Sequence, residues 1–220
     1  SGPFDDIELV GDTVDWEVEL VAVIGRRADR VAEADGWDHV AGVTVGQDIS
    51  DRTLQFAAGS QFSLGKSRRG FGPMGPWVVT PDELDDRDDL AIGCSVDGET
   101  VQEARTSDLI FSVPRLVAEL SAVLPLLPGD VIFTGTPAGV GVPRQEFRAP
   151  DVHRRHRHHP EPGPLNAAPP PRPTPQGGIP RISYLIADGR GWSSEARCPC
   201  RRTTHPRSCP HGGQDGVPSP

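Results

Sequence analysis

Residues 15–25 read DWEVELVAVIG, and the interpretation of the whole chain depends on this stretch. Its second half is a short apolar, β-branched run that ends at a glycine, which is typical of a strand. Side chains alternate along a strand, so we expect Glu17 and Glu19 on one face and Val18 and Leu20 on the other. Two neighbouring carboxylates repel each other and lose hydration, and a divalent cation removes both costs. The alternative is a solvated strand edge with two surface glutamates.

The composition changes sharply near residue 146. Residues 1–146 contain 26 acidic and 11 basic side chains, whereas residues 147–220 contain 5 and 11, together with 15 of the 24 prolines and 6 of the 7 histidines. The segment after residue 145 is nearly free of aliphatic side chains at first, so it cannot repay the entropy cost of ordering. We therefore predict a folded domain over residues 1–145 and a disordered tail over residues 146–220.

The acidic segment is typical of a soluble globular protein. It contains no apolar run close to the ~20 residues of a transmembrane helix and no basic-then-apolar leader. Its single cysteine, Cys94, lies in a strand-like run and is expected to be a small buried apolar residue. These features predict a cytoplasmic protein without a membrane partner.

A second predicted strand, residues 40–45, leads to Asp48, which lies just past the strand end, where loops often carry functional groups. Ser50 is a candidate cap for a helical turn that would bring Asp48, Arg52 and Gln55 close to one face. The alternative is a helix-start aspartate paired with a surface arginine.

The remaining elements are predicted from turn and cap signals. Residues 90–104 form a hairpin around Asp97-Gly98, which suits a type I′ turn. Residues 113–124 form a helix with Ser112 as N-cap and an apolar stripe. A strand at residues 131–134 runs into TGTPAGVG, residues 134–141, whose glycines indicate either a backbone close to a bound group or a tight turn.

Lys66 is the only lysine among 22 basic side chains and lies in the glycine-rich segment 59–75. Either the chain needs a compact ammonium group at this position, or a GC-rich genome has favoured arginine elsewhere.

Five segments in order resemble the fumarylacetoacetate hydrolase family, in its branch of small bacterial 2-hydroxyhepta-2,4-diene-1,7-dioate isomerases and acylpyruvase-like enzymes. They are DWEVEL, VTVGQDISDRTLQ, GKSRRGFGPMGPWVVT, VDGETVQEARTSDLIFSV and LLPGDVIFTGTPAGVG. The resembling part is residues 1–145, which we expect to be truncated at both ends. The resemblance implies an α+β, strand-rich fold, a mixed β-sheet roll with one main helix, and a homodimer.

The resemblance also implies the site and its chemistry. A Mg²⁺ or Mn²⁺ cofactor and a small 2-oxo acid substrate, with a metal-stabilised enolate, are expected in a hydrolase, isomerase or decarboxylase of aromatic-compound catabolism. Carried over position by position, the metal ligands are Glu17, Glu19 and Asp48, the catalytic residues are Lys66 and Arg52, and the substrate-binding residues are Gln55, Gly135 and Thr136.

Three departures from the family pattern leave a second interpretation open. The chain begins after the lid loop that carries a His/Glu pair in the family, Arg68-Arg69 replaces an aromatic and a small or acidic residue, and the closing C-terminal hairpin is missing from the expected place. The rival to an active enzyme is an inactive fragment that retains only metal or ligand binding.

The tail has its own alternatives. Its abrupt change of composition motivates the hypothesis that it is an out-of-frame translation, which fails if neither other frame of the gene encodes a Gly-Asp-Val hairpin. The spacing of Cys198, Cys200, His205, Cys209 and His211 is not a common zinc pattern. The basic run 148–159 lacks aromatic side chains, so solvated disorder is favoured over nucleic-acid binding.

Overall fold

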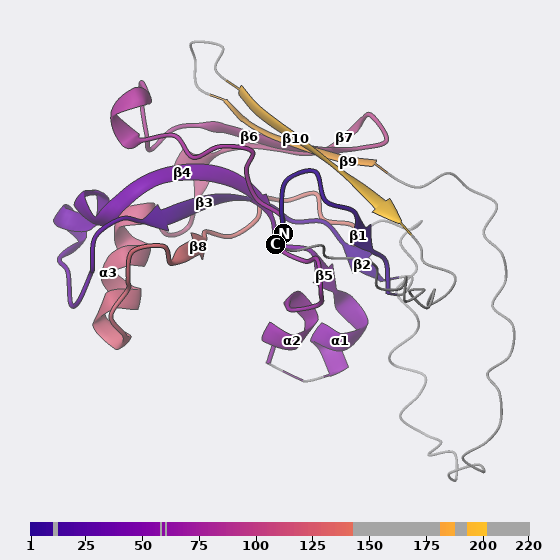
Figure 1. Cartoon of the computed structure of the whole chain (residues 1–220), viewed down its shortest axis with the longest axis horizontal. Helices are drawn as coiled ribbons and strands as arrows, with labels where there is room; N and C mark the ends of the chain where they lie inside the picture. Colours follow the sequence, from indigo (N-terminus) through magenta and orange to yellow (C-terminus); the bar gives the residue numbers. More distant parts are fainter. Residues whose placement is uncertain (11–12, 58, 60, 143–180, 188–192, 202–220) are drawn as a thin grey trace, which may run out of the picture.

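The computed structural model describes residues 1–10, 13–57, 59, 61–142, 181–187 and 193–201. The described strands form three sheets with the orders β1-β10-β9-β6-β7, β2-β5 and β4-β3-β8 (Figure 1). The strands are β1 (Ile7–Glu8), β2 (Val14–Asp15), β3 (Val18–Ile24), β4 (Val40–Gln47), β5 (Ser50–Asp51), β6 (Ala91–Val96), β7 (Glu99–Arg105), β8 (Val131–Phe133), β9 (Arg181–Ala187) and β10 (Ser193–Arg201). The helices are η1 (Glu33–His39), α1 (Arg52–Ala57), α2 (Ser63–Lys66), η2 (Pro81–Glu83), η3 (Thr106–Asp108) and α3 (Val113–Val123).

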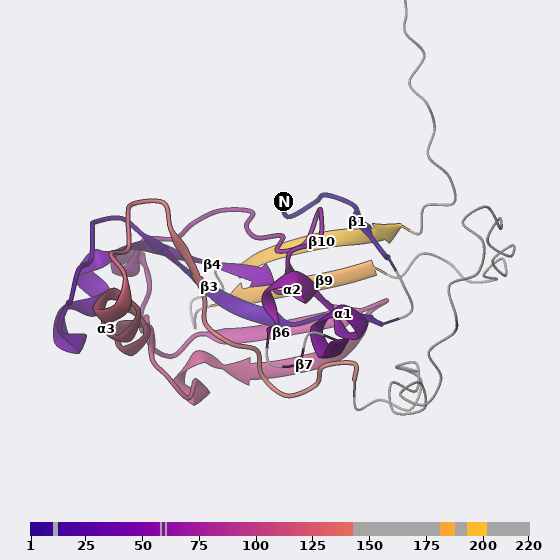
Figure 2. The same ribbon diagram turned by 90° about the horizontal axis from the view of Figure 1, so that it is seen from below.

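The predicted central strand is present as β3, which pairs antiparallel with β4 on one edge and with β8 on the other. Its even-numbered side chains, from Val18 to Ile24, lie in the hydrophobic core. β3 packs on β6 and β4 packs on β9, so the core lies between two layers of sheet (Figures 1 and 2). The alternation predicted from the sequence is therefore confirmed, and Glu17 and Glu19 lie on the face opposite this core.

The predicted hairpin and helix are also confirmed. β6 and β7 pair around Asp97 and Gly98, whose φ angles of 52° and 88° are both positive, as a type I′ turn requires. Ser112 caps α3 by accepting a hydrogen bond from the Arg115 amide at 3.3 Å. Cys94 in β6 is 3% exposed, and burial raises the pKa of its thiol to about 12, so it behaves as an apolar core residue.

Two segments of the tail differ from the sequence prediction, because Arg181–Ala187 and Ser193–Arg201 form a β-hairpin. β9 pairs with β6, opposite Cys94 at Tyr184, and β10 pairs with β1. The physical reason is the apolar content of ISYLIA, residues 182–187, in which Ile182 and Tyr184 are two positions apart and lie in the core. β9 therefore pairs along the edge of β6.

The strand-rich α+β class is confirmed, and α3, with 11 residues, is the longest helix in the described part of the chain. Among the described residues, none of the helices is long and apolar enough to cross a lipid bilayer. The rest of the tail, including His205, Cys209 and His211 of the zinc alternative and the basic run 148–159, lies outside the described residues.

Candidate metal centre

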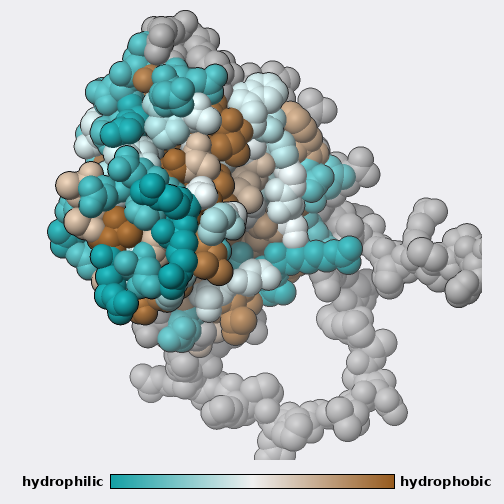
Figure 3. All heavy atoms as spheres, turned by 60° about the vertical axis from the view of Figure 1, so that its left-hand side comes forward, coloured by the Kyte–Doolittle hydropathy of each residue, from teal (hydrophilic) through white to brown (hydrophobic). Residues whose placement is uncertain are grey.

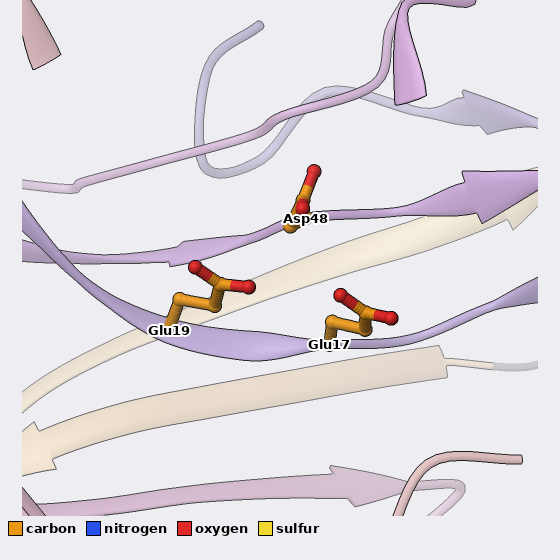
Figure 4. Close-up of side chains that lie close together, drawn as sticks. All are labelled: Glu17, Glu19 and Asp48. Carbon is orange, nitrogen blue, oxygen red and sulfur yellow. The ribbon is translucent and has the colours of Figure 1, made fainter. Parts of the chain in front are cut away.

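Three carboxylates converge where β3 begins and β4 ends. The strand register pairs Val18 with Gln47, so the next residue, Asp48, lies beside Glu17, and its amide donates to the Glu17 carbonyl at 2.8 Å. One oxygen from each of Glu17, Glu19 and Asp48 lies within 4.8 Å of the others. Figure 4 shows the two glutamates on the same side of β3, with Asp48 on the neighbouring segment. The structure thus brings together the three residues predicted as metal ligands.

The cluster is electrostatically costly in the absence of a cation. Burial raises the pKa of Glu19 to about 7, and the negative charges of Asp48 and Glu17 add to the effect, while the Gly135 amide opposes it. Burial also raises the pKa of Asp48, against the opposing effect of Lys66. Hard oxygen donors at this separation are the ligands that Mg²⁺, Mn²⁺ and Ca²⁺ prefer. The donor set therefore fits a divalent cation.

Lys66, at the end of α2, contributes its ammonium group to this cluster. Its Nζ lies 2.8 Å from Glu17 Oε2 and also donates to Asp48 Oδ2. Burial lowers the pKa of Lys66, but the hydrogen bonds to the two carboxylates outweigh burial and raise it overall. The lysine is therefore charged, and it partly offsets the acidic charge next to the cation position.

Arg52, at the start of α1, is held in a buried network instead of facing solvent. Its guanidinium donates to Asp15 Oδ2 at 2.9 and 2.7 Å and lies 2.6 Å from Glu17 Oε1. Gln55 accepts a third bond from Arg52 at 2.8 Å, as the predicted helical spacing implies. The helical turn is present, but its cap is the Asp51 side chain, which accepts from the Leu54 amide, and not Ser50.

The glycine-rich segment after β8 lies directly against the cluster. The Gly135 amide donates to Glu19 Oε2 at 2.7 Å, and Gly135 has a φ of 102° that favours glycine. The Thr136 hydroxyl donates to the Val18 carbonyl at 3.0 Å. The loop therefore lies against one of the predicted metal ligands, and the closeness of its glycines to a bound group stays a prediction.

A hollow of about 420 Å³ adjoins the cluster at Glu17. Its polar lining is Glu17, Arg52 and Thr136, and its other wall is apolar. That wall consists of Phe56, Pro137, Ala138, Val140 and Val142. Gln55, Lys66 and Gly135 are not among the residues that line the hollow, so their predicted contacts with substrate stay predictions.

Sequence reasoning missed three buried polar side chains around the cluster. The Asp15 carboxylate accepts hydrogen bonds from the Arg52 guanidinium and from the Gly141 amide. The side-chain oxygen of Gln47 accepts from the Glu17 amide at 3.0 Å, and that of Gln102 accepts from the Val18 amide at 2.9 Å. A signal was available only for Gln47, a polar residue in the otherwise apolar strand β4, whereas β2 is too short and β7 too polar to give one. A buried amide or carboxylate must find partners, so such a residue indicates a built network.

The sequence is similar to those of known proteins. Residues 1–164 match the family described as "Fumarylacetoacetate (FAA) hydrolase C-terminal". The chain is 44% identical over 154 residues to a mitochondrial oxaloacetate tautomerase of Bos taurus, covering 69% of this chain and 48% of that protein. It thus spans about half the length of the curated relatives that it matches.

Solved structures show the same fold. The 2-hydroxyhepta-2,4-diene-1,7-dioate isomerase of Mycobacterium marinum is 33% identical with a TM-score of 0.70, over 93% of this chain and 66% of that one. The maleylpyruvate hydrolase of Sphingobium sp. SYK-6, in complex with a manganese (II) ion and pyruvate, is 28% identical with a TM-score of 0.68, over 93% of this chain and 61% of that one.

Proposed function

Because the chain belongs to the fumarylacetoacetate hydrolase family, we propose that it binds Mg²⁺ or Mn²⁺ through Glu17, Glu19 and Asp48 and acts on small 2-oxo acids. The observation that carries this proposal is the convergence of three carboxylates within 4.8 Å beside a hollow that one of them lines. The manganese ion and pyruvate bound to the similar maleylpyruvate hydrolase support both the cation and the ligand class.

The residues around the cluster have separate tasks in this proposal. A bound cation would supply Lewis-acid polarisation of the carboxylate and keto oxygens of a 2-oxo acid. The Gly135 amide orients Glu19, and the Asp15–Arg52 pair orients Glu17. Lys66 and Arg52 offset negative charge that develops on the substrate oxygens, and the apolar wall of the hollow offers a contact surface to the rest of the substrate. Hydrolysis, isomerisation and decarboxylation of 2-oxo acids all require this stabilisation of negative charge.

A second candidate is a chain that binds metal and ligand without turnover. The chain spans about half the length of its curated relatives. In the described part of the chain the only histidine is His39, whose ring contacts the Arg26 carbonyl at 3.3 Å. This part therefore offers no histidine to the cluster as a general base, and a carboxylate or water would have to move the proton.

The two candidates are separated by measuring binding and turnover on the same 220-residue chain. Manganese binding is measured by the loss of the free-ion electron paramagnetic resonance signal, and turnover is followed with oxaloacetate, acetylpyruvate and fumarylpyruvate, with and without EDTA. Metal-dependent turnover supports the enzyme, and binding of Mn²⁺ and pyruvate without turnover supports the inactive fragment. A chain that binds no Mn²⁺ contradicts both.

A homodimer is part of the same proposal. Exposed apolar side chains gather at the end of α3 and in the turn after it, where Val123, Leu124 and Leu127 are 82%, 50% and 51% exposed. Figure 3, in which this side of the molecule comes forward, shows apolar patches between polar ones. Contiguous exposed patches of this kind mark interaction surfaces. Sedimentation equilibrium tests this, and Val123→Glu is expected to lower the dimer fraction.

A further inference from the structure

On the edge of β3 that faces β8, the backbone ladder ends before the strand reaches the metal cluster, whereas on the other edge the β4 ladder continues through Glu19 and Val18. On the first edge, β8 pairs only with Val21–Val23, and the last backbone bond is donated by Thr134 to the Leu20 carbonyl at 3.1 Å. Beyond that point, the Val18 carbonyl accepts from the Thr136 hydroxyl instead. On this edge, the strand end that presents the glutamates is therefore held by side chains, because no strand of the described part pairs with it there.

Gln102 in β7 is the main side chain in this arrangement. It is 1% exposed, and its carbonyl oxygen accepts the Val18 amide at 2.9 Å. Its amino group donates to the Thr136 hydroxyl at 2.8 Å and to the Pro137 carbonyl at 2.9 Å. Through three hydrogen bonds within the protein, the Gln102 amide thus links its own strand, β7, to β3 and to loop 134–137.

The loop that Gln102 holds is the loop that orients a metal ligand. Gly135, which donates to Glu19 Oε2, is the residue before Thr136. Thr136 itself is fixed from two sides, because it accepts from Gln102 and donates to Val18. Without the glutamine, Thr136 keeps its bond to the Val18 carbonyl and Thr134 keeps its bonds to the Leu20 carbonyl, but Pro137 loses its link to β7. The position of the Gly135 amide, and with it the orientation of the Glu19 carboxylate, then becomes less defined.

We propose that Gln102 is a positioning residue that fastens loop 134–137 to the strand end and thereby sets the affinity of the cluster for its cation. This inference rests on the proposed metal site. Outer partners of metal ligands typically change metal affinity by about 10- to 100-fold when they are replaced. Gln102 touches neither the ligand oxygens nor the hollow, so its effect passes through Gly135 and Thr136.

Two variants and one readout of metal binding test this role. Gln102→Met keeps the size of the side chain and removes all three hydrogen bonds, and we expect it to weaken Mn²⁺ binding about tenfold or more. Gln102→Glu keeps the bond from the Val18 amide but cannot donate from a carboxylate, so it separates strand fixation from loop fixation. If the glutamine acts through the loop, Gln102→Glu loses nearly as much affinity as Gln102→Met.

A double-mutant cycle with Thr136→Val tests the route. If Gln102 acts through Thr136, the two substitutions affect Mn²⁺ affinity non-additively, because either one removes the same link. Fully additive effects would overturn the proposed route.

Thr106→Val is the matched control. Thr106, the first residue of η3 directly after β7, is also buried, accepts the Leu90 amide at 2.8 Å and donates to the Asp88 carbonyl, so its replacement removes comparable bonds outside the cluster. We expect it to lower stability and leave Mn²⁺ affinity unchanged. Equal losses of affinity in Thr106→Val and Gln102→Met would reduce the role of Gln102 to general stability and overturn the proposal.

Amide exchange in the metal-free chain separates this inference from the proposed function. We expect the Gly135 amide to exchange about tenfold faster in Gln102→Met than in the wild-type chain and to be unchanged in Thr106→Val. If the wild-type chain binds no Mn²⁺ but Gly135 exchanges faster in Gln102→Met, the proposed function is overturned and the positioning role of Gln102 on the loop is kept. Unchanged Gly135 exchange in Gln102→Met would overturn the positioning role whatever the metal affinity.

Discussion

The two ends of β3 differ in what holds them and in what they hold. At the far end, Val21–Val23 pair with strands on both edges, and Ile24 lies in the core. At the near end, the β8 ladder has stopped, and the side chains of Gln102 and Thr136 replace it. The same strand therefore passes from a region that stabilises the fold to a region that gathers negative charge.

Stability and function are thus separated along β3, between its fully paired far end and its charged near end. At the far end, apolar burial of Ile24 and pairing on both edges stabilise the fold. At the near end, burial of Glu19 and Asp48 opposes their ionised forms and raises the pKa of each. The near end can carry this cost because it is continuous with a well-packed end of the same strand.

The largest expected effect comes from removing charge at the near end. Glu19→Gln is expected to weaken Mn²⁺ binding by about a thousandfold, because it removes a ligand and not only an outer partner. The same substitution is expected to leave the melting temperature at pH 7.5 unchanged or higher, since an ionised buried carboxylate is lost. Metal titration and thermal unfolding of one preparation measure both quantities.

Glu103→Gln is the matched control for this variant. Glu103 is exposed on β7, away from the cluster, and its replacement should change neither quantity. A Glu19→Gln chain that bound Mn²⁺ as well as Glu103→Gln would remove Glu19 from the metal site.

The opposite result is expected from the far end. Ile24→Ala leaves a cavity in the core and is expected to lower the free energy of unfolding by about 3 kcal/mol, with little change in the Mn²⁺ affinity of the folded chain. Urea unfolding gives the first quantity and metal titration below the unfolding transition gives the second. A large loss of affinity in the folded variant would mean that the two ends are not separable.

The pH dependence of stability distinguishes the ends in the metal-free chain. Burial raises the pKa of Glu19 in the folded chain to about 7 from its ordinary value of 4.5, so between these values the folded chain binds more protons than the unfolded chain. Stability therefore falls as pH rises through this window, by about 2–3 kcal/mol from this group. Asp48, whose pKa is also raised, acts in the same direction.

The measurement is the difference between wild type and Glu19→Gln in urea unfolding at pH 5 and pH 7.5. The variant should lack most of the slope that the wild type shows. Parallel curves for the two chains would mean that Glu19 is ionised without cost in the folded state.

How far the site could be predicted depends on how local each signal is. The shared face of Glu17 and Glu19 follows from a period of two within one strand, whereas Asp48 was grouped with them through the family resemblance, and the structure brings all three together. Asp15 and Gln102 have their partners on loop 134–142, far away in the chain, and no local pattern reports such contacts. Their buried polar character could be recognised only after the strands were placed.

The fold was predictable wherever the signals were local. The prediction for the tail failed because it relied on the composition of a long segment. The hairpin around Asp97-Gly98 and the cap at Ser112 are local, and both are present. In the tail, the composition averaged over residues 146–220 concealed the apolar ISYLIA segment, whose Ile182 and Tyr184 reach the core. Composition describes a whole segment, whereas six mainly apolar residues are enough to add a strand to an existing sheet edge.

The smallest expected effect concerns the hollow, which adjoins the near end of β3 through Glu17. Phe56 forms part of its apolar wall and is 48% exposed, so a substrate tail can cover the ring. Phe56→Ala should lower kcat/KM for an acylpyruvate with an alkyl tail by about fivefold, since contact with roughly half of a phenyl ring contributes about 1 kcal/mol. Manganese affinity should stay unchanged, and turnover of oxaloacetate should fall less, because its second carboxylate gains little from an apolar wall.

Phe4→Ala, at an exposed phenylalanine that does not line the hollow, is the control. If both substrates lost the same factor, the wall would act on the cluster itself and would not select the substrate tail.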